Sequence, residues 1–79
     1  MKTKMILDIK KLGLNLKNAR EGAGISQADF VKEISDTYGV GWTTATISRW
    51  ETGKVLMDLD NLVIYSEYFN IPIEQFIYS

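Results

Sequence analysis

Few side chains in this sequence could take part in chemistry, and the absent types narrow the choice further. Neither cysteine nor histidine occurs among the 79 residues, which excludes disulfides, zinc sites built on these ligands, thiol nucleophiles and imidazole-based triads. We therefore expect no enzymatic activity, no metal site and no cofactor. Charge and hydrogen bonding remain, and in the segment Thr43–Lys54 the long cation Arg49 stands among short side chains that can form hydrogen bonds.

The spacing within this segment predicts a helix with one outward polar side. Thr43 is a good N-cap, and Trp42 with Ile47 forms the apolar pair of a hydrophobic staple, which fixes the direction in which a chain enters a helix. If Ile47 faces inward, Trp50 and Glu51 lie within about 60° of it, at about 100° per residue. Gly53 ends the helix. The outward face of the helix is formed by Thr44, Ala45, Ser48, Arg49 and Thr52.

The rest of the chain must position this helix, and its signals are helical as well. Asp8 and Ser26 are N-cap candidates for two earlier helices, Asp58 caps a fourth, and a short last helix follows Pro72. Residues 36–41 are predicted to form a turn. No alternating strand pattern, linker or repeat is present, so we expect an all-α fold and a single domain over residues 1–79, with 1–7 as a flexible N-terminal extension.

Apolar residues at spacings of three and four predict the faces that pack together. The predicted inward residues are Ile9, Leu12, Leu16 and Ala19, then Phe30, Val31 and Ile34, then Leu59, Leu62, Tyr65, Ser66 and Phe69, and finally Ile73, Phe76 and Ile77. Trp42 and Trp50 are assigned to the core. No apolar run approaches the length of about 18 residues that a membrane span needs, so we expect a soluble, cytoplasmic protein without a membrane partner.

The stretch Leu12–Ile77 resembles the helix-turn-helix domains of the lambdoid phage repressor and Cro type, the XRE family. The resemblance is carried by Arg20, by Ile25-Ser26-Gln27 and by the run Thr46-Ile47-Ser48-Arg49-Trp50-Glu51-Thr52-Gly53-Lys54. It implies a five-helix, lambda-repressor-like bundle in which the second and third helices form the helix-turn-helix. Twenty residues separate Ser26 from Ile47. The compact form of the family has fewer, so the surplus around residues 35–41 lengthens either the second helix or the turn.

The resemblance also implies a function: a transcriptional regulator, a repressor of the phage or small bacterial kind, that binds a double-stranded DNA operator and contacts the major groove with its third helix. Base contacts are then predicted for Thr44, Ala45, Ser48 and Arg49, of which Arg49 can donate two hydrogen bonds to a guanine. Phosphate contacts are predicted for Gln27, Thr43, Thr52 and Lys54. A structural ion pair between Arg20 and Glu51 is implied as well.

Charge by itself does not decide between a nucleic-acid binder and an unevenly charged surface. The net charge is −1, yet residues 1–20 hold six basic side chains, while residues 55–79 hold four acidic ones and no base. Lys10, Lys11 and Lys17 either add to a field that attracts a polyanion or are simply solvated. The alternative function is a protein-interaction module on the same fold, such as an antitoxin or antirepressor.

A homodimer on DNA is expected, because two half-sites multiply the weak affinity of one helix. The candidate dimer surface is the acidic C-terminal section; the other interpretation of its aromatic residues is ordinary core with scattered surface positions. The residues concerned are Tyr65, Tyr68, Phe76, Ile77 and Tyr78. No small-molecule ligand is inferred.

Overall fold

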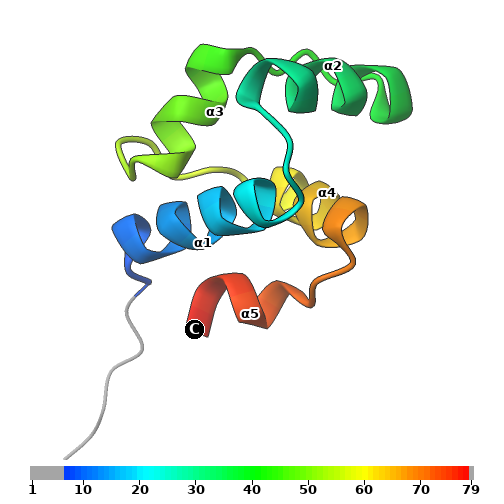
Figure 1. The fold of residues 1–79 in the computed structure, drawn as a ribbon. Helices are drawn as coiled ribbons and strands as arrows, with labels where there is room; N and C mark the ends of the chain where they lie inside the picture. Colours follow the sequence, from blue (N-terminus) through cyan, green and yellow to red (C-terminus); the bar gives the residue numbers. More distant parts are fainter. Residues whose placement is uncertain (1–6, 79) are drawn as a thin grey trace, which may run out of the picture.

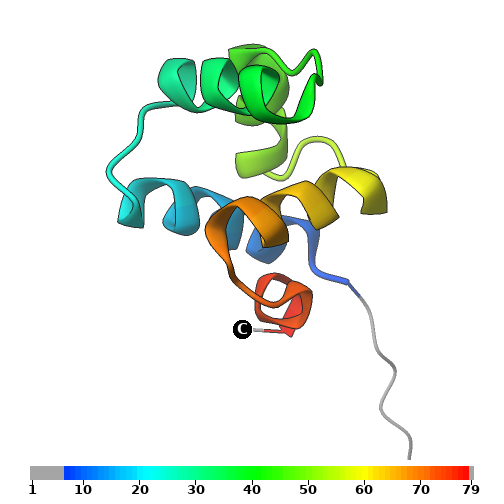
Figure 2. The same ribbon diagram turned by 90° about the vertical axis from the view of Figure 1, so that its right-hand side faces the viewer.

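Five helices make up the described part of the chain, as the sequence predicted. The computed structural model describes residues 7–78, so the predicted extension 1–7 lies outside the described residues except for Leu7. The helices are α1 (Ile9–Gly22), α2 (Gln27–Tyr38), α3 (Thr44–Glu51), α4 (Leu59–Phe69) and α5 (Ile73–Tyr78). Helices α2 and α3 lie on one side of α1, and α5 lies on the other (Figure 1). The view turned by 90° shows α4 beside α1, between these two outer layers (Figure 2).

The predicted N-caps place the starts of the helices. The Asp8 carboxylate accepts hydrogen bonds from the Lys10 and Lys11 amides, both at 3.1 Å. The Ser26 hydroxyl accepts from the Asp29 amide at 3.1 Å. The Thr43 hydroxyl accepts from the Thr46 amide at 3.2 Å. Asp58 stands at the N-cap of α4 but makes no side-chain cap bond, so α4 begins without this support.

The core is rich in aromatic rings, and Trp42 links the start of α3 to α4. Its ring stacks on Tyr65 of α4, with centroids 5.5 Å apart, and meets Trp50 of α3 edge-on at 5.0 Å. Trp42 and Ile47, the predicted staple, are both buried. Because aromatic pairs in these geometries are attractive beyond their buried area, this cluster fixes the angle at which α3 leaves the core.

The prediction of a turn over residues 36–41 is wrong for its first half, because α2 continues through Tyr38 and ends at Gly39, whose φ is +70°. Contacts between tyrosines and carboxylates hold α2 against α4, and Tyr38 makes one of them from the added turn. The Tyr68 hydroxyl donates to Glu33, and burial together with this bond raises the pKa of Tyr68 to about 12. Burial, with the charge of Glu67 and a hydrogen bond to it, also raises the pKa of Tyr38.

On α4 and α5, one predicted inward residue needs correction, and one choice that the sequence left open is decided. Leu59 was predicted to face inward, but it is 66% exposed. It is the first residue of α4, and the core at that end is already filled by Met57 and Leu62. Tyr65 and Phe76, which the sequence placed both among the inward residues and on the candidate dimer surface, are at most 1% exposed and belong to the core. Of the predicted dimer residues, Tyr78 is exposed and Tyr68 and Ile77 are half-buried.

Helices α1 and α3 approach each other at Gly13 so closely that no side chain fits between them. A Cβ atom on Gly13 would lie 2.4 Å from the Trp50 carbonyl oxygen and 2.7 Å from that of Glu51. These are backbone atoms, which cannot move aside as a flexible side chain can. Gly13 therefore sets the spacing between α1 and α3.

We expect Gly13→Ala to destabilise the fold by about 1–3 kcal/mol, because the added methyl group overpacks this contact. In an uncrowded helix the same change stabilises by up to about 1 kcal/mol. The matched control is Gly22→Ala in the same helix, where a Cβ would meet nothing within 4 Å. Thermal unfolding should show a lower Tm for Gly13→Ala and an unchanged or higher Tm for the control. A rise in Tm for Gly13→Ala would contradict the close approach.

Tyr65 carries a buried hydroxyl that has no hydrogen-bond partner among residues 7–78, and burial raises the pKa of this group. A buried, unpaired polar group costs about 1–3 kcal/mol, so Tyr65→Phe should keep or increase the free energy of unfolding in urea. Tyr68→Phe, which removes a hydroxyl that does have a partner, should decrease it. A clear loss of stability in Tyr65→Phe would show that its hydroxyl is bonded in solution.

Candidate nucleic-acid interface

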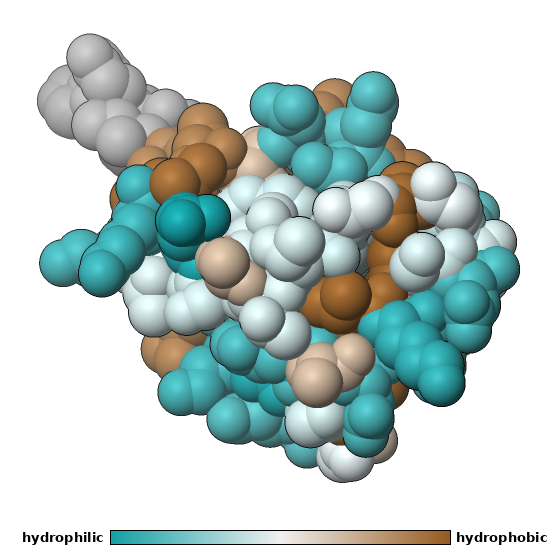
Figure 3. Space-filling view, turned by 90° about the horizontal axis from the view of Figure 1, so that it is seen from above, coloured by the Kyte–Doolittle hydropathy of each residue, from teal (hydrophilic) through white to brown (hydrophobic). Residues whose placement is uncertain are grey.

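Helix α3 buries one side and exposes the other, and the predicted base-contacting residues share the exposed side. Ile47 is fully buried, and Trp50 and Glu51 are each 6% exposed. Thr44, Ala45 and Arg49 are exposed, with half-buried Ser48 at the margin of the face. Seen from the side of α2 and α3, residues of intermediate hydropathy form a broad area between strongly hydrophilic ones (Figure 3). This surface offers short side chains around one long cation.

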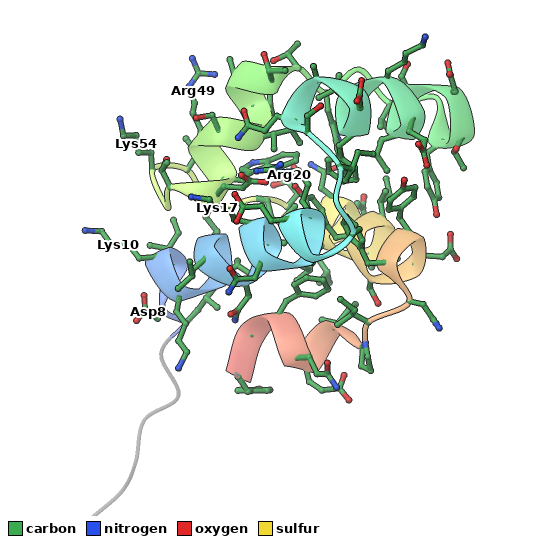
Figure 4. All side chains as sticks on the ribbon, in the orientation of Figure 1. Asp8, Lys10, Lys17, Arg20, Arg49 and Lys54 are labelled. Atoms are coloured by element: carbon green, nitrogen blue, oxygen red, sulfur yellow. The ribbon has the colours of Figure 1, made fainter. Side chains whose placement is uncertain are left out.

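Three cations project toward the same side of the molecule: Arg49 from α3, Lys54 from the turn after it, and Lys10 from the first turn of α1 (Figure 4). The turn is a Schellman motif, in which the Lys54 amide donates to the Arg49 carbonyl and the Gly53 amide to that of Trp50. Gly53, with φ +73°, lies against α1, where a Cβ would come within 2.8 Å of the Lys10 Cα. The end of α3 and the start of α1 therefore touch.

Among residues 7–78, no carboxylate lies within 4.0 Å of the charged group of any of these three cations. In the part of the chain that the structure describes, ion pairs within 4.0 Å are made by Arg20 alone. Arg49 and Lys54 thus keep their charges exposed to solvent, and both are free to meet an anion. The surplus residues between Ser26 and Ile47 lengthen α2, whose C-terminal end lies away from α3 (Figure 1).

Beneath this surface, the Glu51 carboxylate joins three elements. Arg20 of α1 donates from Nε to Oε2 at 2.7 Å and from its Nη2 to Oε1 at 2.9 Å, and its Nη1 donates to the Ile25 carbonyl at 2.8 Å. This is the pair that the sequence predicted. Arg20 is 7% and Glu51 6% exposed, and the hydrogen bond to Glu51 is the main cause of the raised pKa of Arg20. The guanidinium thus holds α1, the α1–α2 turn and α3 together.

Gln27, predicted to contact a phosphate, donates its amide to the same carboxylate. Its Nε2 lies 3.1 Å from Glu51 Oε1. A glutamine amide has two N–H groups, so this bond leaves a second donor at the N-terminus of α2, where the helix dipole favours an anion. The structure thus places Gln27 between the buried ion pair and the surface.

Thr43 and Thr52, the two threonines predicted to contact phosphates, differ in the hydrogen bonds that their hydroxyl groups already make. The Thr52 hydroxyl donates to the Ser48 carbonyl at 2.8 Å, so its hydrogen is already in use, and a phosphate contact would require it to rotate. The Thr43 hydroxyl accepts the Thr46 amide and lies 3.1 Å from the Thr46 hydroxyl. Both threonines are exposed at the ends of α3.

Sequence reasoning missed Gly13, the carbonyl of Ile25 and the bond from Gln27 to Glu51. A glycine inside an amphipathic helix was a signal for the first, because such a residue costs helix stability unless a close packing contact requires it. The other two depend on the relative positions of helices and had no local signal. Within residues 7–78 there is no group of three carboxylates that could hold a metal ion, and no helix has the length and hydropathy to cross a membrane.

Comparison with known protein families gives a match over residues 16–76, to the helix-turn-helix family. The chain belongs to this family. The match confirms the predicted relationship to XRE-type domains, and in this helix-turn-helix protein α2 and α3 are the two helices of the motif.

Among solved structures, the fold is similar to that of the S. venezulae BldD DNA-binding domain, with a TM-score of 0.70 over 87% of this chain and 94% of that chain. The two sequences are 17% identical, so this likeness concerns the all-α fold. A search of curated proteins found no match.

Removing the charge of Glu51 should loosen the helix-turn-helix unit. Glu51→Gln keeps the shape but leaves the buried Arg20 guanidinium without its anion, and breaking such a buried pair costs about 3–5 kcal/mol. Glu21→Gln is the matched control, since Glu21 also lies near Arg20, at 4.0 Å, but its side chain is 55% exposed. Chemical denaturation should show a large decrease in the free energy of unfolding for Glu51→Gln and almost none for Glu21→Gln. Equal stabilities would mean that the carboxylate does not hold the helices.

Proposed function

We propose that this helix-turn-helix protein is a sequence-specific regulator of transcription that binds double-stranded DNA and inserts α3 into the major groove. The observation that carries the proposal is the exposed, unpaired Arg49 on the outer face of a helix whose inner face is fixed by Trp50 and Glu51. An arginine so placed matches the two acceptors, O6 and N7, that guanine presents in the major groove.

The neighbours of Arg49 suit the same geometry. Ala45 is exposed and small enough to touch a thymine methyl group, and Thr44 and Ser48 are short donors and acceptors for base edges. Short side chains also allow the helix axis to approach the bases closely. We assign base contacts to these four residues, with Arg49 contributing most of the sequence preference.

The phosphate contacts are assigned to the two ends of the motif. Lys54 neutralises a phosphate beyond the C-terminus of α3, Gln27 donates its second N–H at the start of α2, and Thr43 and Thr52 lie at the two ends of α3. Such contacts fix the position of the protein on the duplex without selecting a sequence. Lys10, which touches the turn before Lys54, adds charge to the same side.

We further propose that the protein acts in the cytoplasm as a repressor, by occupying an operator and excluding the polymerase, and that it binds as a homodimer. The net charge of −1 supports a second copy, because one copy with few cations gains little affinity from counterion release. The function is binding rather than catalysis.

Arg49→Ala is expected to weaken binding to the preferred duplex, found by selection from random sequences, by about 1–3 kcal/mol and to change binding to random DNA much less. Lys54→Ala should weaken binding to both duplexes equally. Lys32→Ala is the control for charge, since Lys32 lies in a hollow shared with Asp29, Glu33 and Asp36, and it should change neither. Fluorescence anisotropy at two ionic strengths measures all four proteins.

The salt dependence separates this function from a protein-interaction module. Affinity for DNA should fall with salt at a log–log slope of about −0.9 for each phosphate contacted, whereas an apolar protein interface responds little. Equal losses on both duplexes for Arg49→Ala would reduce Arg49 to a backbone contact. The absence of salt-dependent DNA binding would favour the antitoxin or antirepressor alternative.

A further inference from the structure

The first two turns of α1 lie before the part of the chain that matches the helix-turn-helix family. The match begins at residue 16, whereas α1 begins at Ile9. These turns carry Lys10 and Lys11, two exposed lysines on different sides of the helix, because successive residues point about 100° apart. The family match therefore assigns no role to either lysine, and their surroundings must show what each can bind.

Lys10 packs against the turn that ends α3. A Cβ atom on Gly53 would lie 2.8 Å from the Lys10 Cα and 2.9 Å from its Cγ, so the stem of Lys10 lies directly on the backbone of this turn. Lys54 is the next residue of the turn. The two lysine side chains thus start from adjacent points on the surface, and their flexible four-carbon stems allow both ammonium groups to reach one anion.

Neither of these two ammonium groups has an ion-pair partner among residues 7–78. In that part of the chain, no ion pair within 4.0 Å involves Lys10 or Lys54, and both are exposed. The carboxylate of Asp8, two residues before Lys10, instead accepts hydrogen bonds from backbone amides at the start of α1. Both lysines project to the same side as Arg49 (Figure 4). Two neighbouring like charges repel each other, and an anion between them replaces the repulsion with attraction.

We propose that Lys10 and Lys54 together bind one phosphate of the DNA backbone, so that α1 contacts the duplex in addition to the helix-turn-helix. The inference rests on the proposed binding of α3 in the major groove, and it adds a contact from outside the family match. A DNA phosphate is the occupant that the position favours, because a duplex brings a row of negative charges past the residues on the side of Arg49. The contact fixes the position of the protein and does not select a sequence.

The salt dependence of binding to the duplex found by selection tests whether Lys10 makes this contact. Lys10→Gln removes the charge but keeps an aliphatic stem, so the log–log slope should become less negative by about 0.9. Lys11→Gln, the matched control from the same helical turn, should leave the slope unchanged, and Lys10→Arg should retain it. Thermal unfolding verifies that all three variants are folded. Equal slopes for Lys10→Gln and Lys11→Gln would overturn the proposal.

Neutral methylphosphonate linkages, placed one at a time in the same duplex, test whether the two lysines share a phosphate. At one position the wild type should lose affinity, whereas Lys10→Gln and Lys54→Gln should each lose less than the wild type does. Different positions for the two lysines would refute the shared site. A wild type that binds DNA but shows no such position contradicts only this inference, whereas a wild type without any affinity for DNA contradicts the proposed function and the inference with it.

Discussion

The structure depends on one buried carboxylate. Glu51 accepts hydrogen bonds from Arg20 of α1 and Gln27 of α2 while belonging to α3, so one carboxylate ties the three helices to one another. A buried ion pair contributes little net stability, because the cost of removing both charges from water offsets their attraction. Its value here is geometric: planar arginine, planar carboxylate and amide fit in one arrangement.

This arrangement couples the interior to the surface. One N–H of the Gln27 amide is donated to Glu51. The other is left at the N-terminus of α2, where the helix dipole attracts anions. The same carboxylate that holds α3 also limits the rotamers of Gln27, so a candidate phosphate donor is oriented before any ligand arrives. Less side-chain freedom is then lost on binding, and pre-organisation of this kind increases affinity without an added contact.

Local chemistry explains what could be predicted from the sequence. The caps at Asp8, Ser26 and Thr43 and the outward direction of Arg49 follow from neighbouring residues and helix periodicity. The length of α2 could not be obtained in this way, because its last turn contacts α4 through the hydrogen bond of Tyr38 with Glu67. The exposure of Leu59, the closeness at Gly13 and the bond from Gln27 to Glu51 likewise depend on how separate helices meet.

The backbone contact at Gly13 has a mechanical consequence. The main chains of α1 and α3 are already in contact at Gly13. Helix α3 therefore cannot move closer to α1 when a ligand presses on its outer face. A groove of different width cannot be accommodated by compression of this pair. In the proposed complex with DNA, α3 is therefore held rigidly, and any adjustment is made by the Arg49 side chain and by the bending and groove width of the duplex, whose energetic cost varies with base sequence.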